Sequence, residues 1–218
     1  MKTSKARLPL LVPIALLAVV ALASLPAPAS ASEWFLSGAP LSGSTELSAT
    51  LTKPIAVSIP GAGIKVECPK ATISKLVIFE KNKSQAEKIT LEKCEAPEPS
   101  GCELVEREIK TEAIGLVPTL GAGKSVKLVK APLHSTTVIV VSFGEHCGLA
   151  SGSKVPLKGK VVTNAPTLQE EKLEQKVEFL GKSAEGLSAE IGKAEFPAFV
   201  TGELTEKVAA GEKAWSFH

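Results

Sequence analysis

The chain contains no Asp and no Tyr, and its single Arg beyond residue 31 is Arg107. Calcium sites usually combine several Asp and Asn ligands in short loops, and the Asn residues here are Asn82 and Asn164. Arg is the residue preferred for bidentate binding of phosphate or carboxylate groups. Stacking sites for sugars and bases favour Trp and Tyr, of which the chain offers Trp34 and Trp215. These shortages argue against calcium, phosphate, sugar and nucleic-acid sites.

The N-terminal segment has the pattern of an export signal. Three of its first seven residues are basic, and the uncharged run Leu8–Leu25 follows, interrupted by Pro13. Ala29 and Ala31 then supply the small-x-small spacing that signal peptidase requires. We therefore expect a secretory signal peptide over residues 1–31 and a mature chain over 32–218, secreted or held at the outer face of the cell envelope. The alternative is an uncleaved membrane anchor, although the apolar run is short for a span.

Removal of this segment changes the electrostatic argument. Three of the 25 basic residues lie in it, which leaves 22 bases against 23 acids and a net charge of −1. A chain with this balance gives no electrostatic reason to bind nucleic acid. Residues 121–125, Gly-Ala-Gly-Lys-Ser, imitate the end of a phosphate-binding loop, but Pro118 occupies the position of its first Gly and a strand pattern follows. We expect no nucleotide, no cofactor and, after signal cleavage, no membrane span.

The mature region carries an even number of cysteines, namely Cys68, Cys94, Cys102 and Cys147. In an exported chain this number predicts two disulfides; free thiols or a metal site are the alternatives, and no Cys-x-x-Cys spacing is present. Three pairings are possible. Residues 95–101 are rich in turn formers, so we expect Cys94–Cys102, which leaves Cys68–Cys147.

The body of the chain alternates between apolar and polar residues in short runs separated by Gly, Pro and Ser. This pattern predicts a single all-β domain, an antiparallel β-sandwich or barrel-like fold. The expected strands are Thr72–Glu80, Lys88–Cys94, Ser125–Lys130, Ser135–Phe143, Val155–Thr163, Leu187–Ile191 and Ala194–Val200. Residues 168–180 are rich in helix formers, yet their second half alternates, so we expect a strand there and leave the first half open.

Several spaced motifs occur in order along the mature chain. They are Trp34 with Gly38, Leu91 with Cys94, Pro99–Cys102, Ile109 with Thr111, Ile114 and Gly115, Val141 with Phe143, Cys147 and Leu149, and a closing segment around Ala198, Gly202 and Trp215. In these motifs the chain resembles a group of uncharacterised secreted β-rich proteins that recur in high-GC Gram-positive soil bacteria. It departs from them in its richness in Lys and Glu. The resemblance implies compartment and fold, and it supplies no catalytic residue.

The residue types required for catalysis are few. His134, His146 and His218 are the only histidines, and without Asp a Glu such as Glu145 would have to orient His146 as a base. We assign no catalytic, cofactor-binding or metal-binding residue. The expected function is that of a non-catalytic extracellular or envelope-associated binding or structural module. The alternative is a secreted glycosidase-like hydrolase that acts through Glu, assisted by His146 or His134; a concave pocket that brings together two Glu, or a Glu and a His, would favour it.

Overall fold

The computed structural model describes residues 32–218 except 81, 112, 121–125, 133–134 and 181–185. The expected signal peptide, with Ala29 and Ala31, lies outside the described residues. The described part is built from antiparallel strands, and its helical turns are the short 3₁₀ segments η2 (Pro60–Ala62) and η3 (Gly148–Ala150). The all-β prediction is therefore confirmed. In this part of the chain there is no helix with the length and apolar character needed to cross a membrane.

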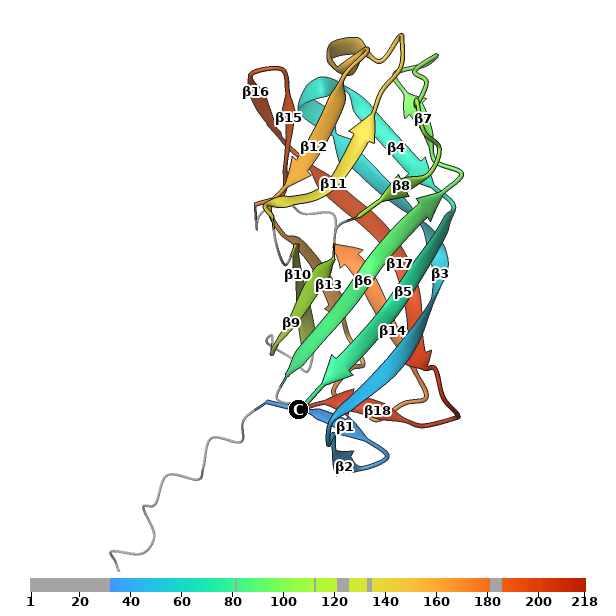
Figure 1. Cartoon of the computed structure of the whole chain (residues 1–218), viewed down its shortest axis with the longest axis vertical. Coiled ribbons are helices and arrows are strands. Elements are labelled where there is room, and N and C mark those ends of the chain that lie inside the picture. Colours follow the sequence, from blue (N-terminus) through green and yellow to red (C-terminus); the bar gives the residue numbers. More distant parts are fainter. Residues whose placement is uncertain (1–31, 81, 112, 121–125, 133–134, 181–185) are drawn as a thin grey trace, which may run out of the picture. The chain divides into compact units, whose positions relative to one another are not determined.

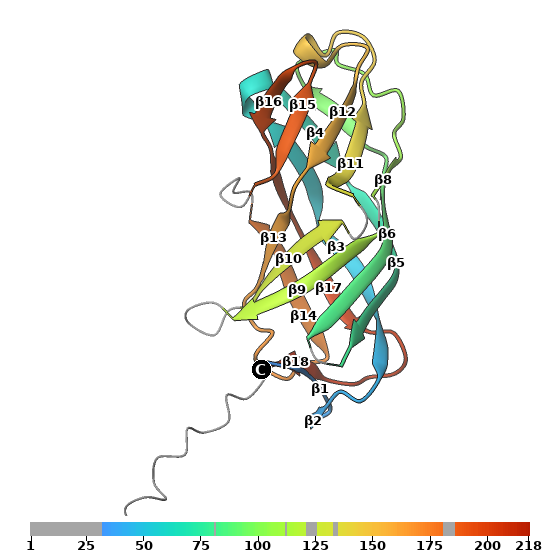
Figure 2. The same ribbon diagram turned by 60° about the vertical axis from the view of Figure 1, so that its left-hand side comes forward.

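The strands form three sheets (Figure 1, Figure 2). The largest has the pairing order β17 (Phe199–Val208), β14 (Glu174–Leu180), β13 (Val161–Ala165), β10 (Val126–Pro132), β9 (Ile114–Leu120), β6 (Lys83–Glu92), β5 (Lys70–Phe79), β3 (Ser44–Ile59), β4 (Ile64–Cys68) and β7 (Glu95–Glu98), with β8 (Ile109–Lys110) beside β6. The second contains β11 (Thr137–Ser142), β12 (Lys154–Lys158), β15 (Ser188–Ile191) and β16 (Ala194–Pro197). The third contains β18 (Trp215–Phe217), β1 (Trp34–Leu36) and β2 (Ala39–Pro40).

The long strand β3 organises the largest sheet. One register runs from Ile59 opposite Ile64 in β4 to Ser44 opposite Phe79 in β5, so β4 and β5 together form the second arm of one long hairpin. The other edge of β3 pairs with β17 from Leu47 to Ser58. The order of pairing therefore leads from β3 through β5, β6, β9, β10, β13 and β14 to β17 and back to β3. This return covers strand edges that would otherwise present unpaired backbone groups.

The first and last strands of the described chain, β1 and β18, pair with each other. Trp34 in β1 lies opposite Phe217 in β18, and the rings of Trp34 and Trp215 lie 5.8 Å apart. The fully buried Gln175 of β14 fixes β18 in place, because its Nε2 donates hydrogen bonds to the carbonyl oxygens of Trp215 at 2.7 Å and Glu170 at 2.8 Å. A buried amide of this kind is tolerated because its donors are satisfied.

The expected strands occur, with different bounds where a turn or a bulge intervenes. Residues 155–163 form β12 and β13, because Gly159 takes a φ of +109° between them. Residues 194–200 divide between β16 and β17. Of the ambiguous segment, the second half is β14, as expected, and the first half forms turns that lead into it.

The disulfide pairing expected from the sequence is wrong. The bonds are Cys68–Cys94 and Cys102–Cys147, and the described cysteines include no free thiol. Residues 95–98, taken as a turn, instead form β7 and pair with β4, which brings Cys94 beside Cys68 with the Cα atoms 4.1 Å apart. The segment that follows then pairs with the end of β11, where Leu104 bridges Phe143, and this contact carries Cys102 to Cys147.

Candidate binding cavity and charged sites

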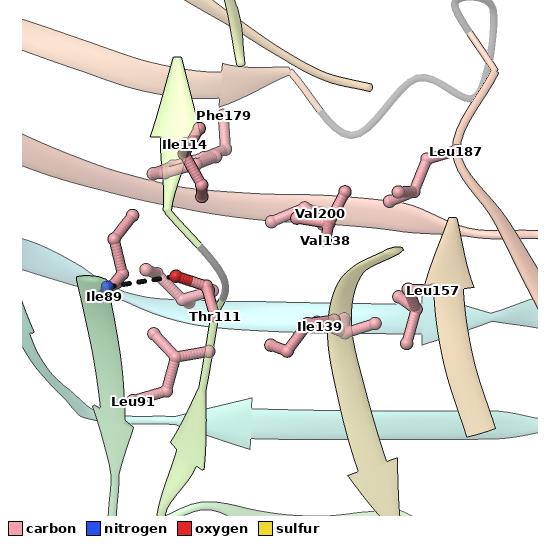
Figure 3. A pocket seen from close by; sticks show the side chains of 12 residues that line it. Ile89, Leu91, Thr111, Ile114, Val138, Ile139, Leu157, Phe179, Leu187 and Val200 are labelled. Atoms are coloured by element: carbon pink, nitrogen blue, oxygen red, sulfur yellow. Dashed lines mark hydrogen bonds between the residues drawn. The ribbon is translucent and has the colours of Figure 1, made fainter. Parts of the chain in front are cut away.

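Apolar side chains from the two larger sheets converge on a cavity of about 50 Å³ (Figure 3). They come from strands far apart in the sequence: Ile55, Val57, Ile89, Leu91, Thr111, Ile114, Val138, Ile139, Leu157, Phe179, Leu187 and Val200. All of them except Thr111 and Val200 are buried. On β11 the register shifts between Thr137 and Ile139, so the neighbours Val138 and Ile139 both line the cavity, whereas Val140 points outward and is 42% exposed.

Thr111 supplies the one polar side chain among the described residues of the lining. Its Oγ1 accepts a hydrogen bond from the backbone N–H of Ile89 at 3.0 Å, which Figure 3 shows as a dashed line. Its own backbone N–H donates to the carbonyl of Ile89 at 2.9 Å, and the residue also bridges Ile139. Thr111 therefore joins β6 to β11 at the cavity, and its oxygen already holds a structural hydrogen bond.

The chemistry of the lining limits what the cavity can do. The described residues of the lining include no carboxylate, imidazole, amine or thiol, so none of these side chains can transfer a proton or attack a substrate at neutral pH. A void of this size in an apolar core costs about 1 kcal/mol of stability at roughly 24 cal/mol per Å³. The cavity is suited to binding rather than to catalysis.

A second feature is the carboxylate of Glu203 on β17. Only 8% of the surface of this residue is exposed to water. Lys176 Nζ on β14 and Lys53 Nζ on β3 lie 2.8 and 2.9 Å from its Oε2, and Thr52 donates to Oε1 at 2.9 Å. The hydrogen bonds from Lys176 and then Lys53 lower the pKa of Glu203 from its ordinary value of 4.5 to about 2. A carboxyl group held ionised in this way cannot act as the general acid of a glycosidase.

A groove beside the first disulfide brings two carboxylates together. Glu67 of β4 lies opposite Glu95 of β7, and both line a groove of about 280 Å³ with Lys93 and three prolines. Lys65 Nζ lies 2.6 Å from the carboxylate of Glu67, and Arg107 lies 3.8 Å from that of Glu95. Their side chains are 44% and 71% exposed, so both carboxylates are solvated. Two other pockets of the described residues are also lined by two Glu residues, Glu174 with Glu212 and Glu95 with Glu103. Of these three pairs, Glu67 and Glu95 are the one whose members lie opposite each other on paired strands.

The histidines give the hydrolase little support. His146 and Glu145 both lie exposed in the turn after β11, while His134 lies outside the described residues. His218 Nε2 lies 3.0 Å from Ser216 Oγ, a distance suited to a nucleophile and its base. However, Ser216 is only 1% exposed, so a substrate cannot reach its hydroxyl.

The structure also bears on the phosphate-binding loop and the metal sites that the sequence analysis considered. Residues 121–125 lie outside the described residues, and the chain after them is the strand β10, as expected, where a phosphate-binding loop needs a helix. Among the residues that the structure describes, no group of three or more His, Cys or Glu is placed to hold a metal ion.

The cavity was not predicted from the sequence. Four of its residues, Ile55, Val57, Thr111 and Ile114, lie outside the strands expected from the sequence. The alternation places Ile89 and Leu91 on one face of their strand. Whether opposed side chains touch or leave a gap depends on the distance between the two sheets. This distance cannot be derived from the hydrophobic periodicity of the sequence.

Comparisons with protein-family models, with curated proteins and with solved structures give no match to this chain.

Proposed function

We propose that this chain is a secreted, non-catalytic β-domain that acts as an extracellular or envelope-associated binding or structural module. The observation that carries the proposal is the cavity, where buried side chains from both large sheets meet and the described lining contains no acid, base or thiol. The most buried carboxylate with a shifted pKa, Glu203, is committed to two lysines. The inventory of the described residues thus favours binding over turnover.

The proposed compartment rests on the export pattern of residues 1–31 and on covalent cross-linking. Two disulfides within the mature chain are compatible with an oxidising, extracellular setting. Membership in the secreted β-rich group of high-GC Gram-positive soil bacteria is part of the same proposal and rests on the motif order alone. Mass spectrometry of the protein recovered from its native culture tests export directly, since we expect Ser32 as its first residue.

A second candidate function is a hydrolase that acts through Glu67 and Glu95, favoured by their position in one groove. Two nearby carboxylates are the minimum that a glycosidase needs. Against this candidate, both are exposed and each lies beside a cation, whereas a general acid needs burial that keeps it protonated at neutral pH.

The deciding experiment compares the mature protein with Glu67→Gln and Glu95→Gln on a panel of polysaccharides and esters. Our proposal expects no turnover above background by any of the three proteins. In parallel, the mature protein is used to capture components of the native cell envelope, with excess free protein as competitor. Turnover that either Gln variant abolishes would replace our proposal with the hydrolase.

A further inference from the structure

The cavity of Figure 3 has a lining that selects its occupant. A buried water typically needs two to four polar partners. The oxygen of Thr111 already accepts a hydrogen bond from the backbone N–H of Ile89, and the other side chains of the described lining offer no polar atom. Water therefore gains little by entering, and a charged or strongly polar molecule would lose its hydration without compensation.

The space is left by short side chains that face one another across two sheets. Val57 and Val200 belong to the paired strands β3 and β17, and Val138 and Leu157 belong to the paired strands β11 and β12. Figure 3 shows Val138, Leu157 and Val200 converging from separate strands. Since Val200 is only partly buried, the lining is not sealed on every side.

We propose that this cavity binds small uncharged hydrocarbons or the methyl end of an unbranched hydrocarbon chain, an inference that rests on the proposed role as a binding module. The volume of about 50 Å³ admits a few non-hydrogen atoms. An aromatic ring is too large, since benzene occupies engineered cavities of about 150 Å³. A longer chain places only its end inside, while any polar head group stays in water.

Two probes distinguish the two possible ligands, a free small apolar molecule and the end of a hydrocarbon chain. Xenon reports a site for free small apolar molecules, and a soluble medium-chain fatty acid reports a site for the end of a chain. Methyl NMR of the mature protein follows Val138, Leu157 and Leu187 during each titration. We expect saturable chemical-shift changes confined to the methyl groups that line the cavity. Changes with xenon alone indicate a site for small molecules. Changes with both probes, or with the fatty acid alone, indicate a site for the end of a chain.

The matched variants are Val138→Ile and Val140→Ile. Both lie on β11 and both add one methylene, but Val138 faces the cavity whereas Val140 faces solvent. We expect Val138→Ile to weaken binding several-fold and to raise the melting temperature slightly, and Val140→Ile to bind as the parent does. Because one added methylene preserves the fold, the comparison stays informative.

Two outcomes would overturn this inference: the absence of a saturable shift with both probes, or equal binding by the parent and Val138→Ile. Either would leave the module proposal standing, since that proposal is decided by turnover and by capture from the envelope. Conversely, turnover at Glu67 or Glu95 would remove the module and leave the cavity result to stand by itself.

Discussion

The ionised state of Glu203, which lies on β17, depends on side chains from two other strands, β3 and β14. Its carboxylate lies between Lys53 of β3 and Lys176 of β14, and it accepts a further hydrogen bond from Thr52. The sequence shows only one Glu among many that alternate with Lys. Register determines which Lys lie beside it, because Glu203 pairs with Lys53 on one side and with Glu178 on the other.

We expect Glu203→Gln to lower the melting temperature by a few degrees at neutral pH. The pKa of Glu203 is lower in the folded chain, about 2, than its ordinary value of 4.5. The stability that the ionised group contributes is therefore fully present above about pH 4.5 and is lost as the pH falls towards 2. Both lysines are partly exposed, so solvent screening keeps the effect moderate.

Thermal unfolding of the parent and the variant from pH 2 to pH 7 measures this effect. The control is Glu178→Gln. Glu178 also forms an ion pair with Lys176, whose Nζ lies 3.0 Å from its carboxylate, but this carboxylate is more exposed than that of Glu203. The difference between parent and Glu203→Gln should shrink on acidification. A difference that is independent of pH would contradict the ion-pair account.

At the scale of elements, the pairing of β17 with β3 depends on a glycine. Gly202 has a φ of +145°, and the strand register shifts on either side of Glu203. A Cβ at Gly202 would lie 2.9 Å from the carbonyl oxygen of Pro54 and 3.1 Å from the Cα of Ile55. Only glycine permits both this conformation and this close approach of the two strands.

We expect Gly202→Ala to destabilise the fold by roughly 1–3 kcal/mol, the usual cost of forcing a side chain into such a conformation. Gly211→Ala is the matched control, because Gly211 also has a positive φ, +89°, but open space around it. Denaturant unfolding of both variants gives the comparison. Equal losses of stability in the two variants would show that the positive φ alone causes the destabilisation and that the close approach of Gly202 to β3 does not contribute.

The same scale explains which elements were predicted. The alternating run of β6 and the continuous β-branched run of β11 are visible in the sequence because neighbouring residues along one chain define them. The strand β7, Glu95–Glu98, contains Pro97 and reads as a turn, and only its pairing with β4 makes it a strand. The misassigned disulfides follow from this one element, because the chosen pairing assumed that Cys94 and Cys102 closed a turn.

At the scale of the whole molecule, the two disulfides link parts that the chain order separates. They close loops of 26 and 45 residues. The loop-entropy model assigns them similar stabilisation, about 3.5 and about 4 kcal/mol.

We therefore expect Cys68→Ala/Cys94→Ala and Cys102→Ala/Cys147→Ala to lower the melting temperature by similar amounts, each roughly 10 °C for a domain of this size. The informative control is Cys94→Ala/Cys102→Ala, which breaks both bonds and should be the least stable of the three. If it instead loses less than the other two, the bonds are Cys94–Cys102 and Cys68–Cys147, because each of the other variants would then break both bonds. Peptide mapping without reduction supplies an independent reading.

The sequence alone determined the features that local pattern and composition control. Alternating apolar residues predicted an all-β domain, an even number of cysteines predicted disulfides, and the absence of Asp and Tyr and the scarcity of Arg limited the possible binding and catalytic sites. Only the tertiary structure decided which strands pair, which cysteines bond and where a cavity is left. The physical reason is that these depend on distances between residues remote in sequence: Glu67 meets Glu95 through β4 and β7, and Val57, Val138 and Val200 enclose a space that no single strand contains.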